Sequence, residues 1–476
     1  MRLPPLAPLA LLLASAAVSA ACGQSSEPGP AEAGAGGRAR PNVLFLVVDD
    51  LNTWVGCMDR PAVRTPNIDR LARRGVLFTR AYAAAPSCNP SRTAFLTGVP
   101  PHVSGVYYNN QDWRPKIAGI AGAATLPEHF KANGYRSVGA GKIFHKFFEH
   151  DAAWDEFFGG GTTPLPAPES RPLFGLAGLE RLEWAPMQAP EEEMRDSRVA
   201  TWAAERLAAA ADEDQPLFLA AGIFRPHLPW IVPQADLDRY PIEAVELPKV
   251  PEGDLDDLPA SGRAYADTAL QHAVVQHGKW KELVRAYQAS ITFADRCVGR
   301  ILDALDASGR ADDTIVVLAS DHGWHLGEKQ HWRKFALWER TLRVPLVVVA
   351  PGITPAGAVC DRPVGLMDLY PTLIDLCGLP ARDVEGDSLR PLLEDPAAAW
   401  PHVVLSTHSP GNYSACDGRY RYIRYADGGE ELYDHHADPD EWVNLAGAAE
   451  HARRKAQLAV HLPQEAAEDD APEGSR

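Results

Sequence analysis

Four continuous apolar runs of strand length stand out along the chain, over residues 42–48, 217–222, 314–320 and 344–350. A run that is apolar at every position is typical of a strand buried on both faces, and so of a parallel sheet covered by helices. The first run ends in Asp49-Asp50 and the third ends in Asp321-His322. Polar residues therefore follow directly where these two predicted strands stop.

Helical patterns separate the apolar runs, over residues 65–75, 126–133, 194–211 and 280–307. The first has a proline near its start and a glycine at its end, which is the usual asymmetry of helix termini. Alternation of strands and helices predicts an α/β fold with a mostly parallel central sheet flanked by helices. Ligands of such sheets bind beyond the carboxyl ends of the strands, where both acidic pairs fall.

The pattern of hydrophobic and polar residues changes after Pro380. Short β-like runs appear at 403–406, 420–425 and 431–433, and a polar stretch of helical composition follows from Glu441. We predict a main catalytic domain over residues 41–380 and a smaller C-terminal α+β subdomain over residues 381–460. The polar residues 461–476 are expected to form a disordered tail.

The first 40 residues predict export. Residues 1–22 combine an early arginine with an apolar stretch and small residues, which is typical of a signal peptide and too short for a membrane span. Cys22 allows two interpretations, a lipoprotein signal with this cysteine lipidated or simple cleavage after an alanine. Residues 23–40 are rich in Gly, Ala, Pro, Ser and Glu and predict a flexible linker. The expected location is the periplasm or cell surface, with membrane contact only through that lipid.

Charge and cysteine content narrow the class of protein. The net charge of −17 argues against nucleic acid as a partner, because phosphate binding needs clustered Lys and Arg. Seven cysteines are scattered without metal-ligand spacing. Either Cys360 pairs with Cys416 or Cys377 in a disulfide, or most of the cysteines are small buried hydrophobic residues.

Several short motifs could carry chemistry, and each also has a plain structural interpretation. Asp49-Asp50 suits Ca²⁺ or Mg²⁺, or forms a solvated turn. Lys142 and His145 share a face if their segment is helical, or are surface and packed residues. His227 lies in a loop fixed by two prolines, and Lys334 stands between aromatic residues.

Cys88 lies in Pro86-Ser87-Cys88-Asn89-Pro90-Ser91-Arg92, which is closed by Leu96-Thr97-Gly98. This Cys-x-Pro-Ser-Arg run resembles the signature of the sulfatase family, within the alkaline-phosphatase superfamily. Ordered landmarks extend the resemblance over almost all of residues 41–446, and the closest branch is the one of the iduronate-2-sulfatases. These landmarks are Asp49-Asp50, Thr65-Pro66-Asn67, Gly141-Lys142, Pro226-His227, Ser320-Asp321-His322-Gly323, Asp368-Leu369-Tyr370-Pro371-Thr372 and Glu431-Leu432-Tyr433-Asp434.

The resemblance implies an alkaline-phosphatase-like fold and a formylglycine made from Cys88 by a formylglycine-generating enzyme, which reads the motif before folding. It implies one divalent cation, usually Ca²⁺ and less often Mg²⁺, held by Asp49, Asp50, Asp321, His322 and the residue 88 side chain. Many sulfatases have Asn where His322 stands, so this ligand departs from the common pattern. Calcium prefers oxygen ligands.

The resemblance also assigns the catalytic roles. Arg92 stabilises the formylglycine hydrate, and Lys142 and Lys334 hold the sulfate oxygens. His227 is the general acid for the leaving alcohol, and His145 accepts the proton of the second hydroxyl as sulfate is expelled.

The expected substrate is a sulfated carbohydrate. Aromatic and amide side chains suit sugar rings and hydroxyls, although each of them could equally pack the core or cap a loop. The candidates are Tyr107, Tyr108, Asn109, Asn110, Trp113, Trp324, His325, His408 and Asn412. Two other functions remain open at this point. One is a phosphonate or phosphate monoester hydrolase of the same superfamily, and the other is a non-catalytic glycan-binding protein in which Cys88 stays a thiol.

Overall fold

The computed structural model describes residues 40–471, except 59–61, 121–122 and 146–148. The predicted signal peptide and almost all of the predicted linker, including Cys22, lie outside the described residues. No helix in the described part of the chain is long and apolar enough to cross a membrane.

A nine-stranded sheet forms the centre of the molecule, in the order β12-β2-β11-β8-β1-β6-β3-β4, with β13 also paired to β2. The predicted parallel arrangement holds from β8 to β4. The bounds of the nine strands are β1 Asn42–Val48, β2 Val76–Tyr82, β3 Arg136–Gly141, β4 Glu156–Phe158, β6 Leu217–Ile223, β8 Thr314–Ser320, β11 Arg343–Val349, β12 Ala358–Cys360 and β13 Val364–Gly365. The run at residues 344–350 differs from the parallel expectation, because β11 is antiparallel to both β8 and β2.

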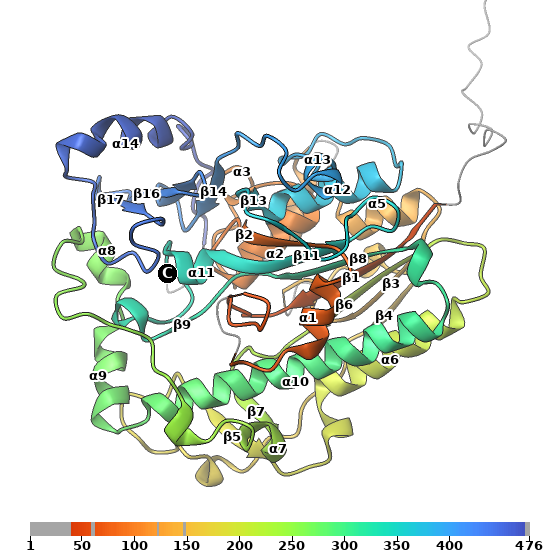
Figure 1. Cartoon of the computed structure of the whole chain (residues 1–476), viewed down its shortest axis with the longest axis horizontal. Coiled ribbons are helices and arrows are strands. Elements are labelled where there is room, and N and C mark those ends of the chain that lie inside the picture. Colours follow the sequence, from red (N-terminus) through yellow and green to blue (C-terminus); the bar gives the residue numbers. More distant parts are fainter. Residues whose placement is uncertain (1–39, 59–61, 121–122, 146–148, 472–476) are drawn as a thin grey trace, which may run out of the picture. The chain divides into compact units, whose positions relative to one another are not determined.

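Helices cover both faces of this sheet (Figure 1). On one face lie α1 Pro66–Ala72, α6 Arg195–Ala209 and α10 Trp280–Ala307. On the other lie α2 Cys88–Thr97, α5 Leu126–Ala132, α12 Leu369–Leu376 and α13 Arg390–Glu394. Alternate side chains of β1 enter the two cores, Leu44 and Leu46 on one face and Val43 and Phe45 on the other, which explains why the run is apolar throughout.

A smaller antiparallel sheet follows, in the order β14-β15-β16-β17. Its strands are β14 Val404–Thr407, β15 Tyr413–Cys416, β16 Tyr420–Arg424 and β17 Glu430–Asp434, and α14 Ala452–Ala459 packs on it through Leu458. The sheet is joined to the main domain by a shared core that includes Tyr82, Trp338 and Ile423. This is the predicted α+β architecture at the C-terminus.

The remaining elements are short and lie in the connections. They are α3 Pro101–Ser104, α4 Trp113–Ala118, β5 Trp184–Met187, β7 Trp230–Pro233, α7 Gln234–Leu237, α8 Ala260–Tyr265, α9 Thr268–Gln276, β9 His325–Leu326, β10 Trp332–Arg333 and α11 Glu339–Leu342. One-turn 3₁₀ helices of the described residues are Asp151–Ala153, Pro168–Ser170, Glu191–Glu193, Ile242–Ala244, Ala311–Asp313, Glu328–Gln330, Leu366–Asp368 and Ala449–His451.

Residues 467–470, near the end of the described part of the chain, bind the main domain. The backbone N–H of Ala467 donates to the His102 carbonyl (2.7 Å), and Tyr107 Oη donates to the Ala467 carbonyl (2.8 Å). Asp470 accepts from Lys116 (2.6 Å) and Asp469 from Tyr108 (3.2 Å). The acidic side chains and the backbone of this segment therefore have hydrogen-bond partners on the main domain.

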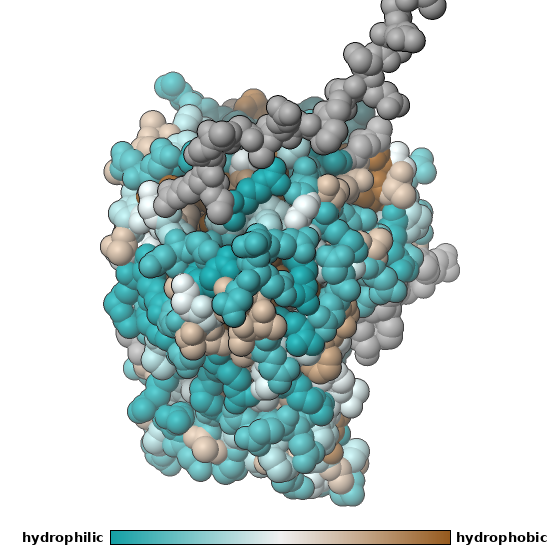
Figure 2. Space-filling view, turned by 90° about the vertical axis from the view of Figure 1, so that its right-hand side faces the viewer, coloured by the Kyte–Doolittle hydropathy of each residue, from teal (hydrophilic) through white to brown (hydrophobic). Residues whose placement is uncertain are grey.

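The cysteines of the described residues are all free, namely Cys57, Cys88, Cys297, Cys360, Cys377 and Cys416. The candidate disulfides of Cys360 are therefore not formed, and all of these cysteines except the half-buried Cys57 are buried. The face of the molecule in Figure 2 is mostly hydrophilic, with hydrophobic residues in small separate spots. Such a surface agrees with the high content of acidic residues.

Candidate active site

The acidic pairs predicted at the strand ends meet. In the sheet register, Val48 of β1 lies opposite Ser320 of β8, so the residues that follow these two strands are neighbours. Asp49, Asp50 and Asp321 are fully buried, and the backbone N–H of Asp50 donates to Asp321 Oδ1 (3.1 Å). Asp50 adopts a left-handed backbone with φ of 61°, an uncommon conformation that turns the chain sharply after β1.

Cys88 is the first residue of α2, and its thiol lies in the middle of the polar cluster. Four side chains approach Sγ to within 3.6 Å: Lys334 Nζ (2.9 Å), Lys142 Nζ (3.3 Å), His322 Nε2 (3.3 Å) and Asp49 Oδ1 (3.6 Å). The side chain of Cys88 is fully buried. In the formylglycine form implied by the resemblance, Sγ would be replaced by oxygen, so these contacts mark where that oxygen would lie.

Arg92 lies one helical turn after Cys88 but contacts the carboxylates and not the thiol. Its guanidinium donates to Asp321 Oδ2 (2.8 Å) and to Asp49 Oδ1 (3.0 Å), and its side chain is 1% exposed. A further hydrogen bond reaches the Ile143 carbonyl (3.0 Å). Arg92 therefore ties the ends of β1 and β8 to the segment after β3.

Two lysines enter the cluster from separate segments. Lys142 follows β3 and donates to Asp49 Oδ2 (2.5 Å), while Lys334 follows β10 and donates to Asp50 Oδ1 (2.8 Å). The expected shared helical face of Lys142 and His145 is absent, because the chain makes a bend there and not a helix. Gly141, with φ of 75°, permits that bend, and a Cβ there would meet the Gly222 carbonyl oxygen at 2.0 Å.

Three histidines surround the cluster. His322 is fully buried with Nε2 3.4 Å from Asp50 Oδ1. His227 is 26% exposed, its Nε2 lies 3.9 Å from Asp50 Oδ2, and its Nδ1 pairs with the Leu228 carbonyl (2.6 Å). His145 forms a side-chain hydrogen bond with Cys88. All the predicted catalytic and metal-binding residues are thus brought to one place.

The charges of the cluster shift its pKa values strongly. Burial opposes ionisation of the Cys88 thiol, but Lys142, Lys334 and His322 outweigh it and hold its pKa well below the ordinary value. Burial raises the pKa of Asp321 to about 6 in spite of Arg92. Burial lowers the pKa of His322, but Asp321 and Cys88 outweigh this effect and raise it to about 9. Such perturbed values are typical of functional sites.

The cluster fits a divalent cation. Ligand atoms of Asp49, Cys88, Asp321 and His322 lie within 4.8 Å of one another, and Asp50 adds a buried oxygen, Oδ2, without a hydrogen-bond partner among the described residues. Carboxylate oxygens are the ligands that Ca²⁺ and Mg²⁺ prefer.

A second acidic group of similar spacing, Glu339, His435 and Glu441, is neutralised from within the protein. Arg421 Nε lies 3.0 Å from Glu441, and a second nitrogen of the same guanidinium pairs with Glu339. Burial lowers the pKa of His435, but Glu339 and Glu441 outweigh it and raise it to about 10. This group is an ion-pair cluster that joins the two domains.

A cavity of about 660 Å³ leads to Lys334. Five of the expected substrate-binding residues line it: Tyr107, Tyr108, Asn109, Asn110 and His408. The other four are used structurally. Trp113 stacks on Phe144, Trp324 and His325 are buried among aromatic residues, and Asn412 binds Ser409 and the backbone of Ala426.

The cavity wall also contains residues that the sequence analysis missed: Arg181, Tyr265, Asp267, His331, Arg333 and Phe335. His331, Arg333 and Phe335 lie within three residues of Lys334, and this proximity was the one available signal. Arg181, Tyr265 and Asp267 come from other segments, and no spacing in the sequence joins them to Lys334.

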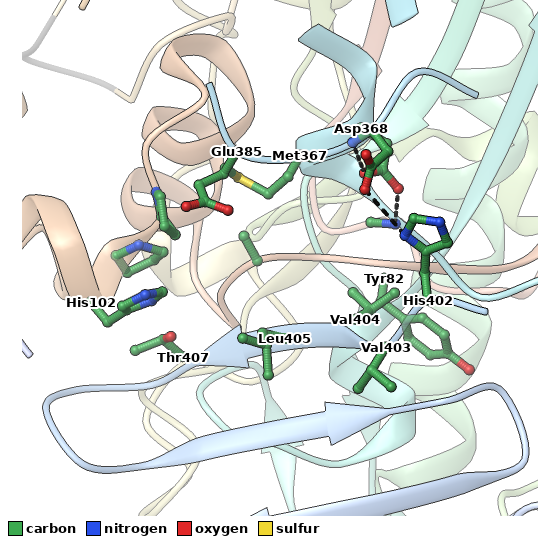
Figure 3. Close-up of a pocket in the computed structure, with 16 residues that line it drawn as sticks. Tyr82, His102, Met367, Asp368, Glu385, His402, Val403, Val404, Leu405 and Thr407 are labelled. Carbon is green, nitrogen blue, oxygen red and sulfur yellow. Dashed lines mark hydrogen bonds and ion pairs between the residues drawn. The ribbon is translucent and has the colours of Figure 1, made fainter. Parts of the chain in front are cut away.

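A separate cavity of about 180 Å³ lies between β14 and the main domain. Figure 3 shows His102 and Thr407 at one side of it and Asp368 and His402 at the other. None of the predicted catalytic or metal-binding residues lines it.

The sulfatase family model matches residues 41–379, which is most of the chain, and a model described as N-sulphoglucosamine sulphohydrolase, C-terminal, matches residues 327–468. The chain therefore belongs to the sulfatase family. It is a hydrolase of sulfate esters with an alkaline-phosphatase-like fold.

Curated relatives agree with the family, and a solved structure agrees with the fold. A sulfatase of Formosa agariphila is 38% identical over 91% of this chain and 88% of its own length. Human iduronate 2-sulfatase is 31% identical over 71% of this chain and 69% of its own length. The phosphonate monoester hydrolase of Silicibacter pomeroyi is similar in fold, with a TM-score of 0.72 and 22% identity over 88% of this chain and 94% of its own.

Proposed function

We propose that this enzyme hydrolyses sulfate monoesters of a carbohydrate, through a formylglycine made from Cys88 and one bound divalent cation. The observation that carries the proposal is the surroundings of Cys88 Sγ, where two lysines and a histidine lie within 3.3 Å. Cationic groups gathered around one buried atom are placed to stabilise the negative charge of a sulfate ester brought to this position.

Once formed, formylglycine supplies as its hydrate a hydroxyl nucleophile and a second hydroxyl for release of the product. Side chains of this protein bind the substrate, stabilise charge and transfer protons. Lys142 and Lys334 hold the sulfate oxygens and offset the negative charge that moves during S–O cleavage. Arg92 keeps Asp49 and Asp321 ionised and correctly placed.

Two histidines carry the protons. His227 is 26% exposed beside Asp50 and delivers a proton to the leaving alcohol oxygen. His145 hydrogen-bonds to residue 88 and accepts a proton there as sulfate leaves. Burial lowers the pKa of His145, which favours the neutral form that a base requires.

The cation is Ca²⁺, and Mg²⁺ is the weaker candidate. Asp49, Asp50 and Asp321 would hold it, with His322 at the edge of the set. Calcium accepts a variable number of oxygen ligands, whereas magnesium requires a strict octahedron. A set of three carboxylates therefore suits calcium better. When bound, the cation lowers the pKa of a coordinated hydroxyl group.

Burial of Cys88 constrains how the enzyme matures. The fully buried side chain is out of reach of any modifying enzyme in the folded protein. A formylglycine-generating enzyme therefore acts on the unfolded chain, before or during the export that residues 1–22 direct. Cys22 is proposed as an optional lipid anchor to the cell surface.

Mass spectrometry of the peptide that contains Cys88 tests the central claim. Conversion of the thiol to an aldehyde lowers the peptide mass, and Cys88→Ala is expected to abolish turnover of an aryl sulfate. Cys57→Ala, at a half-buried cysteine outside the site, is the matched control and keeps its turnover. An unmodified Cys88 in fully active enzyme would overturn the nucleophile assignment.

A comparison of aryl sulfate with aryl phosphate tests the reaction class. The fold neighbours include a phosphonate monoester hydrolase, so this comparison is the relevant one. We expect a higher kcat/KM for the sulfate, because Asp49 and Asp50 offset the charges of the two lysines and leave a site that suits a monoanion better than a dianion. Faster cleavage of the phosphate would replace the proposed function by that of a phosphomonoester hydrolase.

A further inference from the structure

Arg333 differs from the other buried cations around the site. Arg92, Lys142 and Lys334 each pair with a carboxylate within 3.0 Å. Arg333 lies next to Lys334 and lines the same cavity, yet it pairs with no carboxylate of the described residues, and its Nε is buried without a hydrogen-bond partner. A half-buried guanidinium without an anion is costly, so its position calls for an explanation.

The backbone at Arg333 is also held in an unfavourable conformation. Its φ is 78°, and that of Phe335 is 79°, whereas non-glycine residues rarely adopt positive φ. Such a conformation is unfavourable and persists where the surrounding structure fixes it, often at ligand sites. Two contacts fix this segment: β10 pairs with β9, and the N–H of Phe335 donates to the Pro86 carbonyl (3.0 Å).

The surroundings of Arg333 favour a ligand anion. The guanidinium carbon lies 5.5 Å from the centre of the Phe335 ring, which limits its movement. Arg181 lines the same wall, 67% exposed and paired with Asp267 at 3.3 Å. This wall therefore carries two guanidinium groups and one carboxylate. Its net charge is positive even when the lysines that face Cys88 are left out.

The cavity is larger than one sulfate group needs. Its volume of about 660 Å³ is that of a typical small-molecule site and accommodates a sugar ring with its substituents. Lys334 points to Asp50 and Cys88, whereas the adjacent Arg333 belongs to the outer wall. A sugar whose scissile sulfate reaches Cys88 would therefore present its other substituents to Arg333.

We propose that Arg333, assisted by Arg181, forms a second anion-binding subsite, which takes a carboxylate or a further sulfate on the sugar that carries the scissile sulfate. This inference rests on the proposed function and narrows its substrate class to sugars with two anionic groups. Arginine suits this role because its planar fork matches carboxylate and sulfate oxygens in a bidentate manner.

Calorimetric binding to the full-length Cys88→Ala protein tests the subsite without turnover. The probes are a hexose monosulfate, a hexuronic acid monosulfate and a hexose disulfate. We expect at least one of the two doubly charged sugars to bind about tenfold more tightly than the monosulfate, as one charged hydrogen-bonded pair provides. Preference for the uronic acid identifies a carboxylate, and preference for the disulfate identifies a second sulfate.

Arg333→Gln in the same background is expected to remove that preference. Arg333→Lys keeps the charge without the fork, so it retains part of the preference and guards against a folding defect as the explanation. Arg239→Gln, at an arginine that is 43% exposed and outside the cavity wall, keeps the full preference as matched control. Equal binding of all three sugars, or a preference that survives Arg333→Gln, would overturn the subsite.

Failure of the proposed function gives a different result. The reaction is reassigned if peptide mass shows an unconverted thiol in active enzyme, or if phosphate turnover exceeds sulfate turnover. In either case the calorimetric preference still decides whether Arg333 forms an anion-binding subsite.

Discussion

Arg92 shows how one side chain can support a catalytic centre without touching the reacting atom. It is four residues after Cys88 in α2, yet its contacts are with Asp49, Asp321 and backbone carbonyls. The motif therefore makes two separate sets of contacts from one helix, because the thiol of Cys88 contacts Lys142, Lys334 and His322 whereas Arg92 binds Asp49 and Asp321. The sequence places the two residues four positions apart, and only the structure separates their contacts.

Arg92→Gln is expected to lower the free energy of unfolding by about 3–5 kcal/mol, since it leaves two buried carboxylates without their cation. Urea unfolding measures this, and aryl sulfate turnover should be lost as well. Arg74→Gln is the matched control, because its pair with Asp306 is about one-third exposed on both sides and is worth less than about 1 kcal/mol. Equal effects of the two substitutions would contradict the role assigned to Arg92.

The secondary-structure elements divide into those that the hydrophobic pattern determines and those that it does not. The long helix α10 has the predicted bounds, and every predicted apolar run is a strand of the central sheet. The direction of β11 could not be predicted, because a strand buried on both faces has the same pattern in either direction. The bend at Lys142 was missed for another reason: it depends on the positive φ of Gly141.

Asp368, at the start of α12, makes a prediction on pH dependence. Burial raises its pKa to about 7, although the N–H groups of Asp387 and Gly365 donate to it. The stability that protonated Asp368 contributes is therefore fully present below the pKa of this carboxyl in the unfolded chain, near 3.8. It is lost as pH rises through the folded-state pKa of about 7.

Asp368→Asn removes that titration, so the variant should gain stability relative to the parent between about pH 5 and pH 8 in urea unfolding. Loss of the carboxylate acceptor lowers the free energy of unfolding by about 1–3 kcal/mol at pH 5 and pH 8 alike, so it does not affect the change with pH. Asp375→Asn, 38% exposed on α12, serves as control. A difference between parent and variant that stays constant with pH would show that Asp368 does not titrate in this range.

At the scale of the whole molecule, the active site is assembled from distant segments of the chain. Cys88, Lys142, His227 and Lys334 could be found from motifs, because each follows a predicted strand or lies in a distinctive loop. Tyr265 and Arg181 could not, because neither carries a motif and only the folded chain brings them to the same wall. Sequence reasoning therefore recovers the chemistry better than it recovers the specificity.

The C-terminal segment is part of this assembly. Tyr107 and Tyr108 line the cavity, and their hydroxyl groups bind the Ala467 carbonyl and Asp469. Deletion of residues 464–476 is therefore expected to raise KM for a sugar sulfate about three- to tenfold, since two hydrogen bonds that position the wall are lost.

Kinetics with a small aryl sulfate provide the internal comparison for that deletion. This substrate reaches Lys334 without using the tyrosine wall, so its KM should change less than the KM of the sugar. Asp469→Asn alone should give a smaller change in the same direction. An equal rise for both substrates would mean that the segment supports the fold and not the wall.

The position of residues 467–469 has a practical consequence for engineering the enzyme. Gly105 lies so close to this segment that a Cβ there would be 3.3 Å from the backbone oxygen of Glu468. The same segment binds the hydroxyl groups of Tyr107 and Tyr108, which line the cavity. A tag or reporter inserted at residues 467–469 would therefore disturb the cavity wall, and kinetic constants measured with it would describe an altered wall.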